Sequence, residues 1–381
     1  MQILNKQRTY KNYTEISRKF LLEMYSVNET DNVVCSPFSF YILLCIALNA
    51  TSGKSREEIK DAIAKGVSVA NYTDTIKSLQ RDFTERTEGA KLNCSNAICI
   101  KKELFDSILD DFKALVQDGF NGEIFSGDAD MVGKVNAWVN KKTDGIIPRI
   151  MDLPPANLRI MLMNAVAFEA EWEHGYEEDD ICEEYKFTNA DGTISKVTML
   201  DSREKDYIED NFYTGFVKYY KGGRYAFLAL LPKETENKIF FKRALEQADF
   251  RNYYDLRQKC KTYVKMPEFE IKTSAGLTSF CNSLGIKRIF TEEADFRNIT
   301  TKEPLMVDSV LQKAFIKVDR RGTKAFAVTA MCVALGCVYT RDSAKYVTLD
   351  RPFVYAIINR DNGLPVFSGV VNRMRMPQQM I

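Results

Sequence analysis

The stretch of this sequence that decides the fold is Asp319-Arg-Arg-Gly-Thr-Lys-Ala-Phe-Ala-Val-Thr-Ala330. From Thr323 onward, small side chains alternate strictly with larger ones. The small set consists of Thr323, Ala325, Ala327 and Thr329. Because successive side chains of a β-strand face opposite sides, one face of this segment would carry only small residues. Such a strand can slip between two existing strands over a packed core, although on this pattern alone an ordinary edge strand is the better interpretation.

The residues on either side of this stretch set its context. Residues 314–318 are strand-like, whereas residues 331–345 show no clear period and contain Gly336. Loops of that length in compact domains are usually functional or disordered. The sequence therefore predicts that a strand leads into the alternating segment and that a long exposed loop follows it.

Elsewhere, helical and strand-like patterns interleave along the chain. The spacing of apolar residues predicts helices over 13–25, 38–48, 55–63, 104–116 and 131–143. Strand-like runs cover 158–172, 193–199, 225–231, 261–271, 311–318 and 346–358. The two kinds of element do not follow a βαβ rhythm, which favours an α+β fold. Since no linker or internal repeat interrupts the chain, residues 1–381 are expected to form a single domain.

Composition argues against nucleic-acid and membrane partners. The 381 residues are 45% hydrophobic, and 53 basic side chains nearly cancel 52 acidic ones. A net charge of +1 provides no general attraction to nucleic acid or to an anionic bilayer. The longest strongly apolar run, around Phe40 to Leu48, is too short to span a membrane.

Cysteines and the start of the chain bear on the cellular compartment. The nine cysteines are Cys35, Cys45, Cys94, Cys99, Cys182, Cys260, Cys281, Cys332 and Cys337. Their odd number and scattered spacing do not match a disulfide scaffold, so most are expected to be free thiols. Residues 1–20 lack the apolar region of a signal peptide, which keeps a cytoplasmic location open.

Signatures of catalysis are missing from the sequence. His174 is the single histidine, and no G-x-S-x-G elbow accompanies it. The sequence contains no H-E-x-x-H, no C-x-x-C pair and no G-x-G-x-x-G. Gly53-Lys54-Ser55 imitates the end of a P-loop, but Leu48 occupies the required upstream glycine position. Ser55 and Glu58 have capping-box spacing, so a helix start is the better interpretation. We therefore expect no enzymatic activity, metal or cofactor.

Several motifs resemble those of one family. The opening stretch resembles the hinge and reactive-centre loop of serpins, whose pattern is roughly E-E-G-T-E-A-A-A-A-T. The segments Asn32-Val-Val-Cys-Ser-Pro-Phe-Ser39, Val135-Asn-Ala-Trp-Val-Asn-Lys-Lys-Thr-Asp-Gly145 and Met163-Asn-Ala-Val-Ala-Phe-Glu-Ala-Glu-Trp172 resemble three further family motifs. Shorter matches follow in the family's order, namely Met266-Pro-Glu-Phe269, Leu284-Gly-Ile286 with Phe290, Ala294-Asp-Phe296, Arg351-Pro-Phe353 and Phe367-Ser-Gly369. The resemblance covers about residues 10–375 and is specific because the order is kept.

The resemblance implies a fold and an inhibitory mechanism. The fold would be an α+β serpin domain with three β-sheets, about nine helices and an exposed reactive-centre loop over about residues 319–350. A target serine protease would attack this loop as a substrate and form a covalent acyl-enzyme. The freed hinge would then insert into the central sheet and distort the protease before water can deacylate it. The resemblance further implies a monomer, and it favours an extracellular location.

The same correspondence assigns roles to individual residues. The implied hinge residues are Gly322, Thr323, Ala325, Ala327 and Thr329. Ser36 and Asn164 fall at the shutter, where the central strands part, and Trp172 falls at the breach, where the hinge first enters. Gln312 replaces the usual shutter histidine; its amide can donate and accept hydrogen bonds but cannot become charged with pH.

Two further departures from the family pattern concern the hinge. The usual acidic residues around the hinge Gly-Thr are replaced by Arg320, Arg321 and Lys324. Screening should make this reversal of charge inexpensive at exposed positions. Phe326 is larger than the usual alanine, but it lies on the outward face of the predicted strand.

The position of the scissile bond depends on the end from which the loop is counted. Counted forward from Gly322, it falls at Gly336–Cys337; counted backward from Pro352, it falls at Arg341–Asp342. The forward count is preferred because cleavage at Arg341 would leave about five extra residues, or roughly 17 Å of slack, in the tether. Leu335, Val338 and Tyr339 lie near the preferred bond.

These two bonds predict different targets. The residues around Gly336–Cys337 indicate an elastase- or chymotrypsin-like protease, whereas Arg341 would suit a trypsin-like one. The main alternative function is that of a non-inhibitory serpin acting as a chaperone or ligand carrier. Such a protein would be expected to carry bulky or charged inward hinge residues, so the small set seen here favours inhibition.

Overall fold

The computed structural model describes residues 2–27, 29–155, 157–234, 238–323 and 344–374. Nine α-helices lie within these ranges: α1 (Gln2–Val27), α2 (Pro37–Ala50), α3 (Gly53–Ile63), α4 (Val69–Thr84), α5 (Asp110–Ala114), α6 (Met131–Lys142), α7 (Lys238–Glu246), α8 (Phe250–Asp255) and α9 (Thr278–Ser283). Within the same ranges, no helix has both the length and the apolar character needed to cross a bilayer.

The strands of the described residues form two hydrogen-bonded sheets. The central sheet has the order β10 (Phe269–Gly276), β11 (Val307–Asp319), β12 (Gly322–Thr323), β4 (Ile160–Glu171), β2 (Ala90–Ile100) and β3 (Glu123–Ser126). The second sheet has the order β1 (Val33–Cys35), β15 (Pro365–Val371), β14 (Phe353–Asn359), β8 (Tyr225–Pro232), β7 (Tyr213–Tyr219), β6 (Ile194–Glu209), β9 (Gln258–Pro267) and β13 (Lys345–Thr348), with β5 (Ile181–Thr188) paired to β6.

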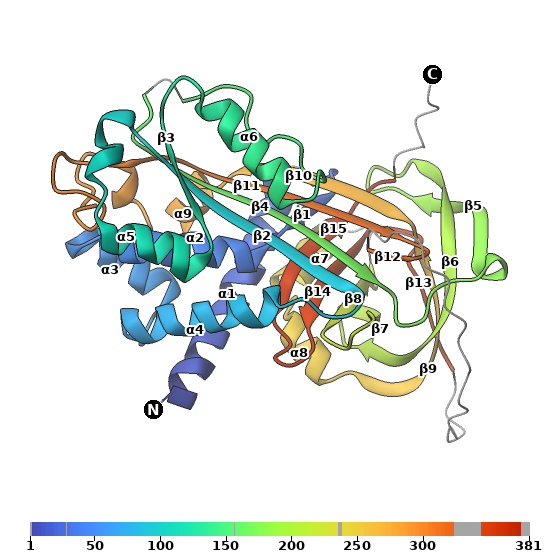
Figure 1. Cartoon of the computed structure of the whole chain (residues 1–381). Coiled ribbons are helices and arrows are strands. Elements are labelled where there is room, and N and C mark those ends of the chain that lie inside the picture. The colour runs from blue at the N-terminus through green and yellow to red at the C-terminus, as the bar shows by residue number, and fades with distance from the viewer. Residues whose placement is uncertain (1, 28, 156, 235–237, 324–343, 375–381) are drawn as a thin grey trace.

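Three long strands dominate the central sheet, and they run side by side across the molecule (Figure 1). β4 is antiparallel to β2 and parallel to β11. The pairing of β4 with β11 places Ile160 opposite Val307 and Asn164 opposite Gln312. Parallel strands need a long connection, and here residues 172–306 supply it. The junction between β4 and β11 therefore joins distant parts of the sequence.

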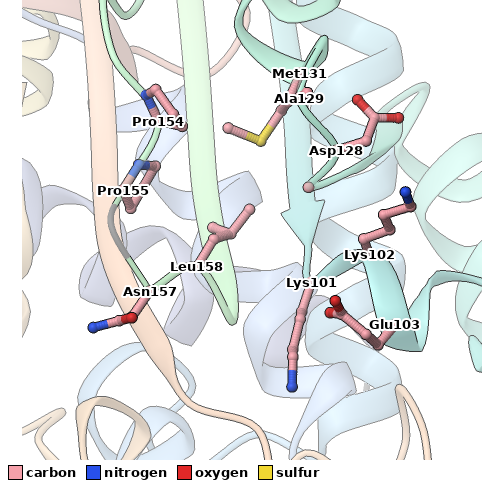
Figure 2. Close-up of a pocket in the computed structure, with 11 residues that line it drawn as sticks. Lys101, Lys102, Glu103, Asp128, Ala129, Met131, Pro154, Pro155, Asn157 and Leu158 are labelled. Carbon is pink, nitrogen blue, oxygen red and sulfur yellow. The ribbon is translucent and has the colours of Figure 1, made fainter.

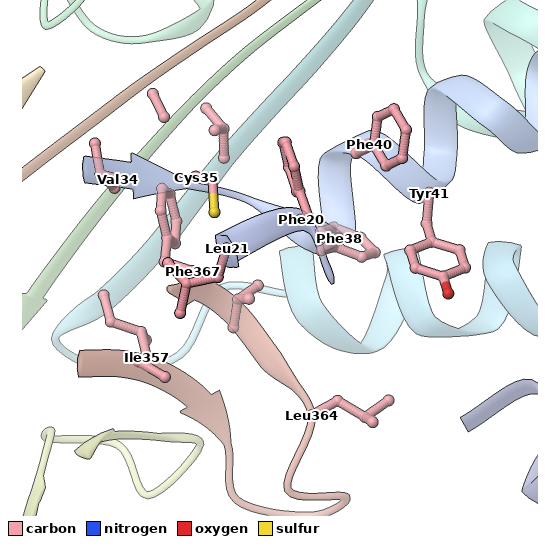
Figure 3. Close-up of a cluster of buried hydrophobic side chains, with 14 of the residues drawn as sticks. Phe20, Leu21, Val34, Cys35, Phe38, Phe40, Tyr41, Ile357, Leu364 and Phe367 are labelled. Carbon is pink, nitrogen blue, oxygen red and sulfur yellow. The ribbon is translucent and has the colours of Figure 1, made fainter. Parts of the chain in front are cut away.

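Apolar layers cover both faces of the central sheet. Every residue of α2 except Asn49 is buried, as expected for a helix that is apolar all round. Figure 3 shows Phe38 and Phe40 of α2 beside Phe20 of α1 in this main core, with Tyr41 further along α2. On the other face, α6 contributes to a smaller cluster, which contains Met131, Val135, Trp138, Met161, Met163, Ala165, Ala167 and Phe315. The central sheet is therefore enclosed between helices (Figure 1).

The predicted α+β fold is confirmed. Helices form at the predicted sites near residues 13–25, 38–48, 55–63 and 131–143, whereas 104–116 is divided among a 3-10 turn, the short α5 and a π turn. The resemblance implies three sheets, whereas hydrogen bonds join the described strands into two. The reason is the 16-residue strand β6, which pairs with β5, β7 and β9 and so joins these strands into one sheet.

The predicted helix start at Ser55 is wrong. α3 begins at Gly53, and Ser52 is its N-cap residue. Ser55 lies inside the helix, where its hydroxyl accepts a hydrogen bond from the backbone of Asp295. The Glu58 carboxylate accepts from the backbone N–H groups of Lys287 and Arg288 instead of closing a capping box. The spacing of Ser55 and Glu58 in the sequence could not show that both side chains form hydrogen bonds with residues far away in the chain.

Candidate functional site

The start of the predicted hinge lies inside the central sheet. β12 pairs antiparallel with β4 on one side, where Gly322 faces Glu171 and Thr323 faces Ala170. On its other side β12 pairs with the end of β11, where Thr323 faces Val318. Direct pairing of β4 with β11 ends before this point, and β12 fills the space between them. Gly322 and Thr323 therefore occupy an interior position in the central sheet.

Glycine is required at position 322 by the close approach of β4. Its φ is +154°, and a Cβ atom added there would lie 1.9 Å from the carbonyl oxygen of Ala170. The backbone of Glu171 would also be too close, at 2.8 Å. Side chains rarely adopt such a conformation, and a main-chain clash of this size cannot be relieved by a rotamer change. Gly322 therefore lets the backbone at this position lie close to that of β4.

Aromatic residues surround the breach, which we define as Trp172, Tyr220, Gly322 and Thr323. The Thr323 side chain is fully buried, and its hydroxyl oxygen lies 2.6 Å from that of Tyr220. The Tyr220 ring stacks on the Trp172 indole with a centroid separation of 4.4 Å and an interplanar angle of 9°. The indole Nε1 donates to the carbonyl of Asp319 at 2.9 Å, and the Trp172 backbone N–H donates to that of Arg321 at 3.1 Å. Trp172 thus holds the chain just before the hinge glycine.

The unusual basic residues before the hinge have acidic partners nearby. The backbone N–H of Arg320 donates to the Glu268 carboxylate at 3.0 Å, and its guanidinium Nε lies 3.5 Å from the same oxygen. The backbone N–H of Arg321 donates to the Asp319 carboxylate at 2.9 Å. Because these side chains are partly exposed, such pairs contribute little to stability. The Arg320 guanidinium therefore has an acidic partner, whereas Arg321 makes its contact through the backbone.

The shutter, which comprises Ser36, Asn164 and Gln312, is closed by a buried amide. The Gln312 side chain accepts from the Ser36 backbone N–H at 2.9 Å and donates to its carbonyl at 3.1 Å. It also donates to the Ser39 hydroxyl at 2.8 Å. The Ser36 hydroxyl in turn donates to the carbonyl of Val366 at 2.8 Å. β11 is thereby tied to the start of α2 at the middle of the β4–β11 junction.

Asn164 lies opposite Gln312 in the sheet, but its side chain forms hydrogen bonds to β2 and not to β11. Its amide nitrogen donates to the carbonyl of Ser95 at 3.2 Å and to the side-chain oxygen of Asn96 at 2.9 Å, both on β2. Its side-chain oxygen is buried and has no hydrogen-bond partner among the described residues. Leaving a buried acceptor unpaired costs about 1–3 kcal/mol. The shutter therefore contains an acceptor that a newly arrived donor could satisfy.

The structure brings together some of the predicted site residues and does not describe others. Gly322, Thr323 and Trp172 meet at the breach, and Ser36, Gln312 and Asn164 lie around the shutter. The following predicted residues lie outside the described part: Ala325, Ala327, Thr329, Gly336, Cys337, Arg341 and Asp342. Sequence reasoning missed Tyr220 and the neighbouring Lys218. A lysine within the otherwise apolar run at 216–220 was a signal that could have indicated a special environment.

A surface pocket lies at the opposite end of β4 from the breach. It has a volume of about 390 Å³, and Figure 2 shows Pro154, Pro155 and Leu158 on one side of it. Lys101 and Asp128 lie on the other side and pair with Glu303 and Lys134 respectively. The 12 residues of β4 separate this pocket from the breach by about 40 Å at the usual strand rise. The pocket is therefore not part of the hinge site.

The thiols and the histidine of the described residues show no catalytic arrangement. The seven described cysteines are all free, and burial raises the pKa of Cys35, Cys45, Cys94, Cys99 and Cys281 to about 12. A thiol with so high a pKa is a poor nucleophile at neutral pH. His174 is exposed. Within the described ranges, no three or more histidine, cysteine or acidic side chains gather in a way that could hold a metal ion.

Comparison with known proteins agrees with this geometry. A family model described as Serpin (serine protease inhibitor) matches residues 11–374. Iripin-2 of Ixodes ricinus is 31% identical over 362 residues, which cover 90% of this chain and 88% of that protein. The thermophilic serpin Tengpin in its native state is 29% identical, with a TM-score of 0.86 and coverage of 97% of this chain and 94% of that chain.

The same comparison indicates which state of a serpin this structure resembles more. Tengpin in its latent state is 28% identical and gives a TM-score of 0.79, with coverage of 96% of this chain and 98% of that chain. The higher similarity is thus to the native state. The chain belongs to the serpin family, whose members are generally protease inhibitors without enzymatic activity of their own.

Proposed function

We propose that this chain, as a monomer, inhibits a serine protease as a suicide substrate whose cleaved loop enters the central sheet. The observation that carries this proposal is β12, because two hinge residues already pair with both β4 and β11. Insertion of the rest of the hinge would then require only that β12 lengthen by further backbone hydrogen bonds to β4 and β11. The order of events would be cleavage, extension of β12 and displacement of the bound protease.

The register of β12 determines where each hinge residue would go. Thr323 faces Ala170 and Val318, and an antiparallel strand moves one residue back along each partner with every step. Six residues further along, Thr329 would lie between Asn164 and Gln312. These two residues face each other directly in the present sheet. Full insertion would therefore separate the two sides of the shutter and place a small polar residue between them.

A hydroxyl group at that position would supply a hydrogen-bond donor to a buried acceptor. The Asn164 side-chain oxygen lacks a hydrogen-bond partner among the described residues, and an inserted Thr329 could donate to it. Side chains two residues apart on a strand share a face, so Ala325 and Ala327 would point into the core with Thr323. Small residues there avoid overpacking, which typically costs 1–3 kcal/mol. The pattern of small hinge residues therefore fits the core beneath the junction.

The larger residues of the hinge would face the other side. In the same register Phe326 would lie between Ala167 and Phe315, which belong to the apolar cluster that packs with α6. Ala167 leaves room beside it, and an aromatic neighbour such as Phe315 can pack favourably against a phenyl ring. The outward face of the inserted strand would thus lie in part beneath a helix rather than in solvent.

The register also bears on the scissile bond. Residue 333 would lie opposite Ile160, the first residue of β4. Cleavage after Gly336 would leave three residues between the end of the sheet and the protease, whereas cleavage after Arg341 would leave eight. The longer tether would add roughly 17 Å of slack and relieve the distortion of the protease. Gly336–Cys337 is therefore the preferred bond, with an elastase- or chymotrypsin-like target.

The covalent step follows the usual chemistry of acyl transfer. The serine hydroxyl of the protease would attack the Gly336 carbonyl carbon, while the protease histidine takes the hydroxyl proton. The bond to Cys337 would then break, and the histidine would return the proton to the leaving amine of Cys337. The ester between the protease serine and Gly336 remains, and strand insertion would prevent its hydrolysis.

Incubation with purified proteases tests this proposal directly. An elastase- or chymotrypsin-like protease should give a complex that survives SDS, and the same protease with its active-site serine blocked should not. The released C-terminal peptide, measured by mass spectrometry, should begin at Cys337. A peptide that begins at Asp342 would instead support the alternative bond and a trypsin-like target. The absence of any SDS-resistant complex over a broad panel of serine proteases would contradict inhibition.

A thermal measurement separates the inhibitory proposal from a chaperone or carrier role. Cleavage of the loop by a non-target protease should raise the melting temperature sharply if the cleaved hinge inserts as a new strand. A non-inhibitory serpin whose hinge does not insert would keep its original melting temperature. The small inward residues of the hinge support the first outcome.

A further inference from the structure

A buried ion pair lies beside the breach. The Lys218 ammonium on β7 is 2.9 Å from the Glu204 carboxylate on β6, and their side chains are only 3% and 10% exposed. The Ser202 hydroxyl donates to the same carboxylate oxygen at 2.8 Å. Burying two charges is costly, and an apolar pair of similar volume would often be no less stable. The presence of the pair at this place therefore calls for a role beyond stability.

The ammonium also lies against two aromatic rings. Lys218 Nζ is 4.4 Å from the centroid of the Tyr176 ring and 5.3 Å from that of the Trp172 ring. A cation over an aromatic face is attracted by the ring quadrupole, more strongly where water is excluded. Burial lowers the pKa of the Lys218 ammonium, but Tyr176 and Glu204 raise it by more, so that the net pKa lies above its ordinary value. Lys218 is therefore a fixed cation at neutral pH.

The ion pair is linked to the hinge by direct contacts. Lys218 lies over Trp172, Trp172 stacks on Tyr220, and the Tyr220 hydroxyl is hydrogen-bonded to Thr323. The indole of Trp172 also donates to the carbonyl of Asp319, just before the hinge. A cation held by a buried carboxylate has a defined place and so limits where the indole can lie.

We propose that the buried Lys218–Glu204 pair is a positioning element for loop insertion, which fixes Trp172 and, through Tyr220, the start of the hinge between β4 and β11. The role in inhibition rests on the proposed function above. A hinge whose first residues are already ordered has less conformational freedom to lose when the loop is cut, so insertion outpaces deacylation. Lys218 is thus a residue that acts through Trp172 rather than on the protease.

A double variant tests the pair without leaving one charge buried and unpaired. Lys218→Met together with Glu204→Gln removes both charges at nearly constant volume, and Gln can still accept from Ser202. Lys196→Met with Glu184→Gln is the matched control, because this exposed Lys–Glu pair joins the neighbouring strands β5 and β6. Their side chains are 63% and 70% exposed.

Two measurements on the full chain should change in the Lys218→Met, Glu204→Gln variant and stay unchanged in the control variant. Backbone hydrogen exchange in peptides that cover residues 319–323 should become about fivefold faster, with exchange in β2 and β14 unchanged. The stoichiometry of inhibition, in moles of chain consumed per mole of protease trapped, should rise by about the same factor. The association rate constant should stay as in the parent, since the loop that meets the protease is unaltered.

The two proposals fail in different ways. If the double variant is folded and hydrogen exchange at residues 319–323 is unchanged, the role of the pair is refuted, whatever the inhibitory activity. If the parent traps no protease at all, the inhibitory function is refuted, and hydrogen exchange still decides the role of the pair. Should the double variant not fold, Ser202→Ala provides the test, because it removes the hydroxyl that orients the Glu204 carboxylate and leaves both charges paired. Exchange should then increase about twofold, and no increase would refute the role of the pair.

Discussion

The breach and the shutter are two ends of one junction between β4 and β11, and they are in different states. At the breach the strands have already parted, and Thr323 lies fully buried between them. At the shutter the strands still pair directly, and three hydrogen bonds from the Gln312 side chain tie β11 to the start of α2. The breach is therefore occupied, whereas the shutter is closed.

This difference indicates where the barrier to the proposed insertion would lie. Extending β12 past Ala325 requires that β4 and β11 separate along residues 160–167 and 307–315, which are paired at present. Each broken backbone pair is replaced by a pair with the incoming strand. The Gln312 contacts have no such guaranteed replacement, because they involve side chains. We infer that the breach sets how insertion begins and that the shutter sets how fast it proceeds.

The largest expected effect comes from closing the breach to the hinge. Thr323→Arg would place an unpaired charge in a fully buried position, so the hinge start should leave the sheet. The variant should be cut as an ordinary substrate, with the yield of trapped protease reduced by more than about tenfold. The measurement is the stoichiometry of inhibition against the protease that the parent traps.

Thr323→Ser is the control for this substitution, because it keeps both a small side chain and the hydroxyl. It should inhibit nearly as well as the parent. If the Thr323→Arg variant traps protease with the parent's stoichiometry, insertion does not use this position.

An intermediate effect is expected at the shutter. Gln312→Ala removes three hydrogen bonds and leaves the buried backbone N–H of Ser36 without its partner, which should lower the free energy of unfolding by about 3 kcal/mol. Because the barrier to strand separation falls as well, the variant should also lose inhibitory activity faster on heating. Denaturant titration and the half-life of inhibition at elevated temperature measure the two effects.

The neighbouring Lys313→Ala serves as the control, since Lys313 is partly exposed and donates to a single carbonyl, that of Arg149. It should change the free energy of unfolding by no more than about 0.5 kcal/mol. Equal stability of the Gln312→Ala variant and the parent would mean that the amide does not hold the shutter closed.

The smallest effect concerns one hydroxyl at the breach. Tyr220→Phe keeps the ring on Trp172 but removes the hydrogen bond to Thr323, which is worth about 1 kcal/mol. The hinge start should leave the sheet more often, and hydrogen exchange at residues 319–323 should become about fivefold faster.

Tyr213→Phe is a matched control, because the buried Tyr213 hydroxyl has no hydrogen-bond partner among the described residues. Its removal should leave exchange at the hinge unaltered. If both substitutions affect the hinge equally, the Tyr220 hydroxyl has no specific role there.

Much of this molecule could be predicted from sequence, and the reasons are local. The apolar run at residues 37–50 predicts a buried helix, and α2 forms there with all but one residue buried. The alternation from Thr323 predicts a strand with a small inward face, and Thr323 does point into the core. β2 was not predicted, because Asn93, Ser95 and Asn96 interrupt its apolar pattern, although Asn96 is buried by its contact with Asn164.

What the sequence determined by itself is the set of short-range properties: which segments are apolar, which can be strands, and that the hinge side chains are small enough to enter a sheet. Only the tertiary structure decided that β12 lies between β4 and β11, that Glu268 pairs with Arg320, and that Lys218 lies buried against Trp172 with Glu204 as its partner. The physical reason is that backbone alternation follows from covalent geometry, which every residue carries with it. Register and buried partners depend instead on strands far apart in the chain, and nothing within either segment specifies which residue of the other will lie opposite.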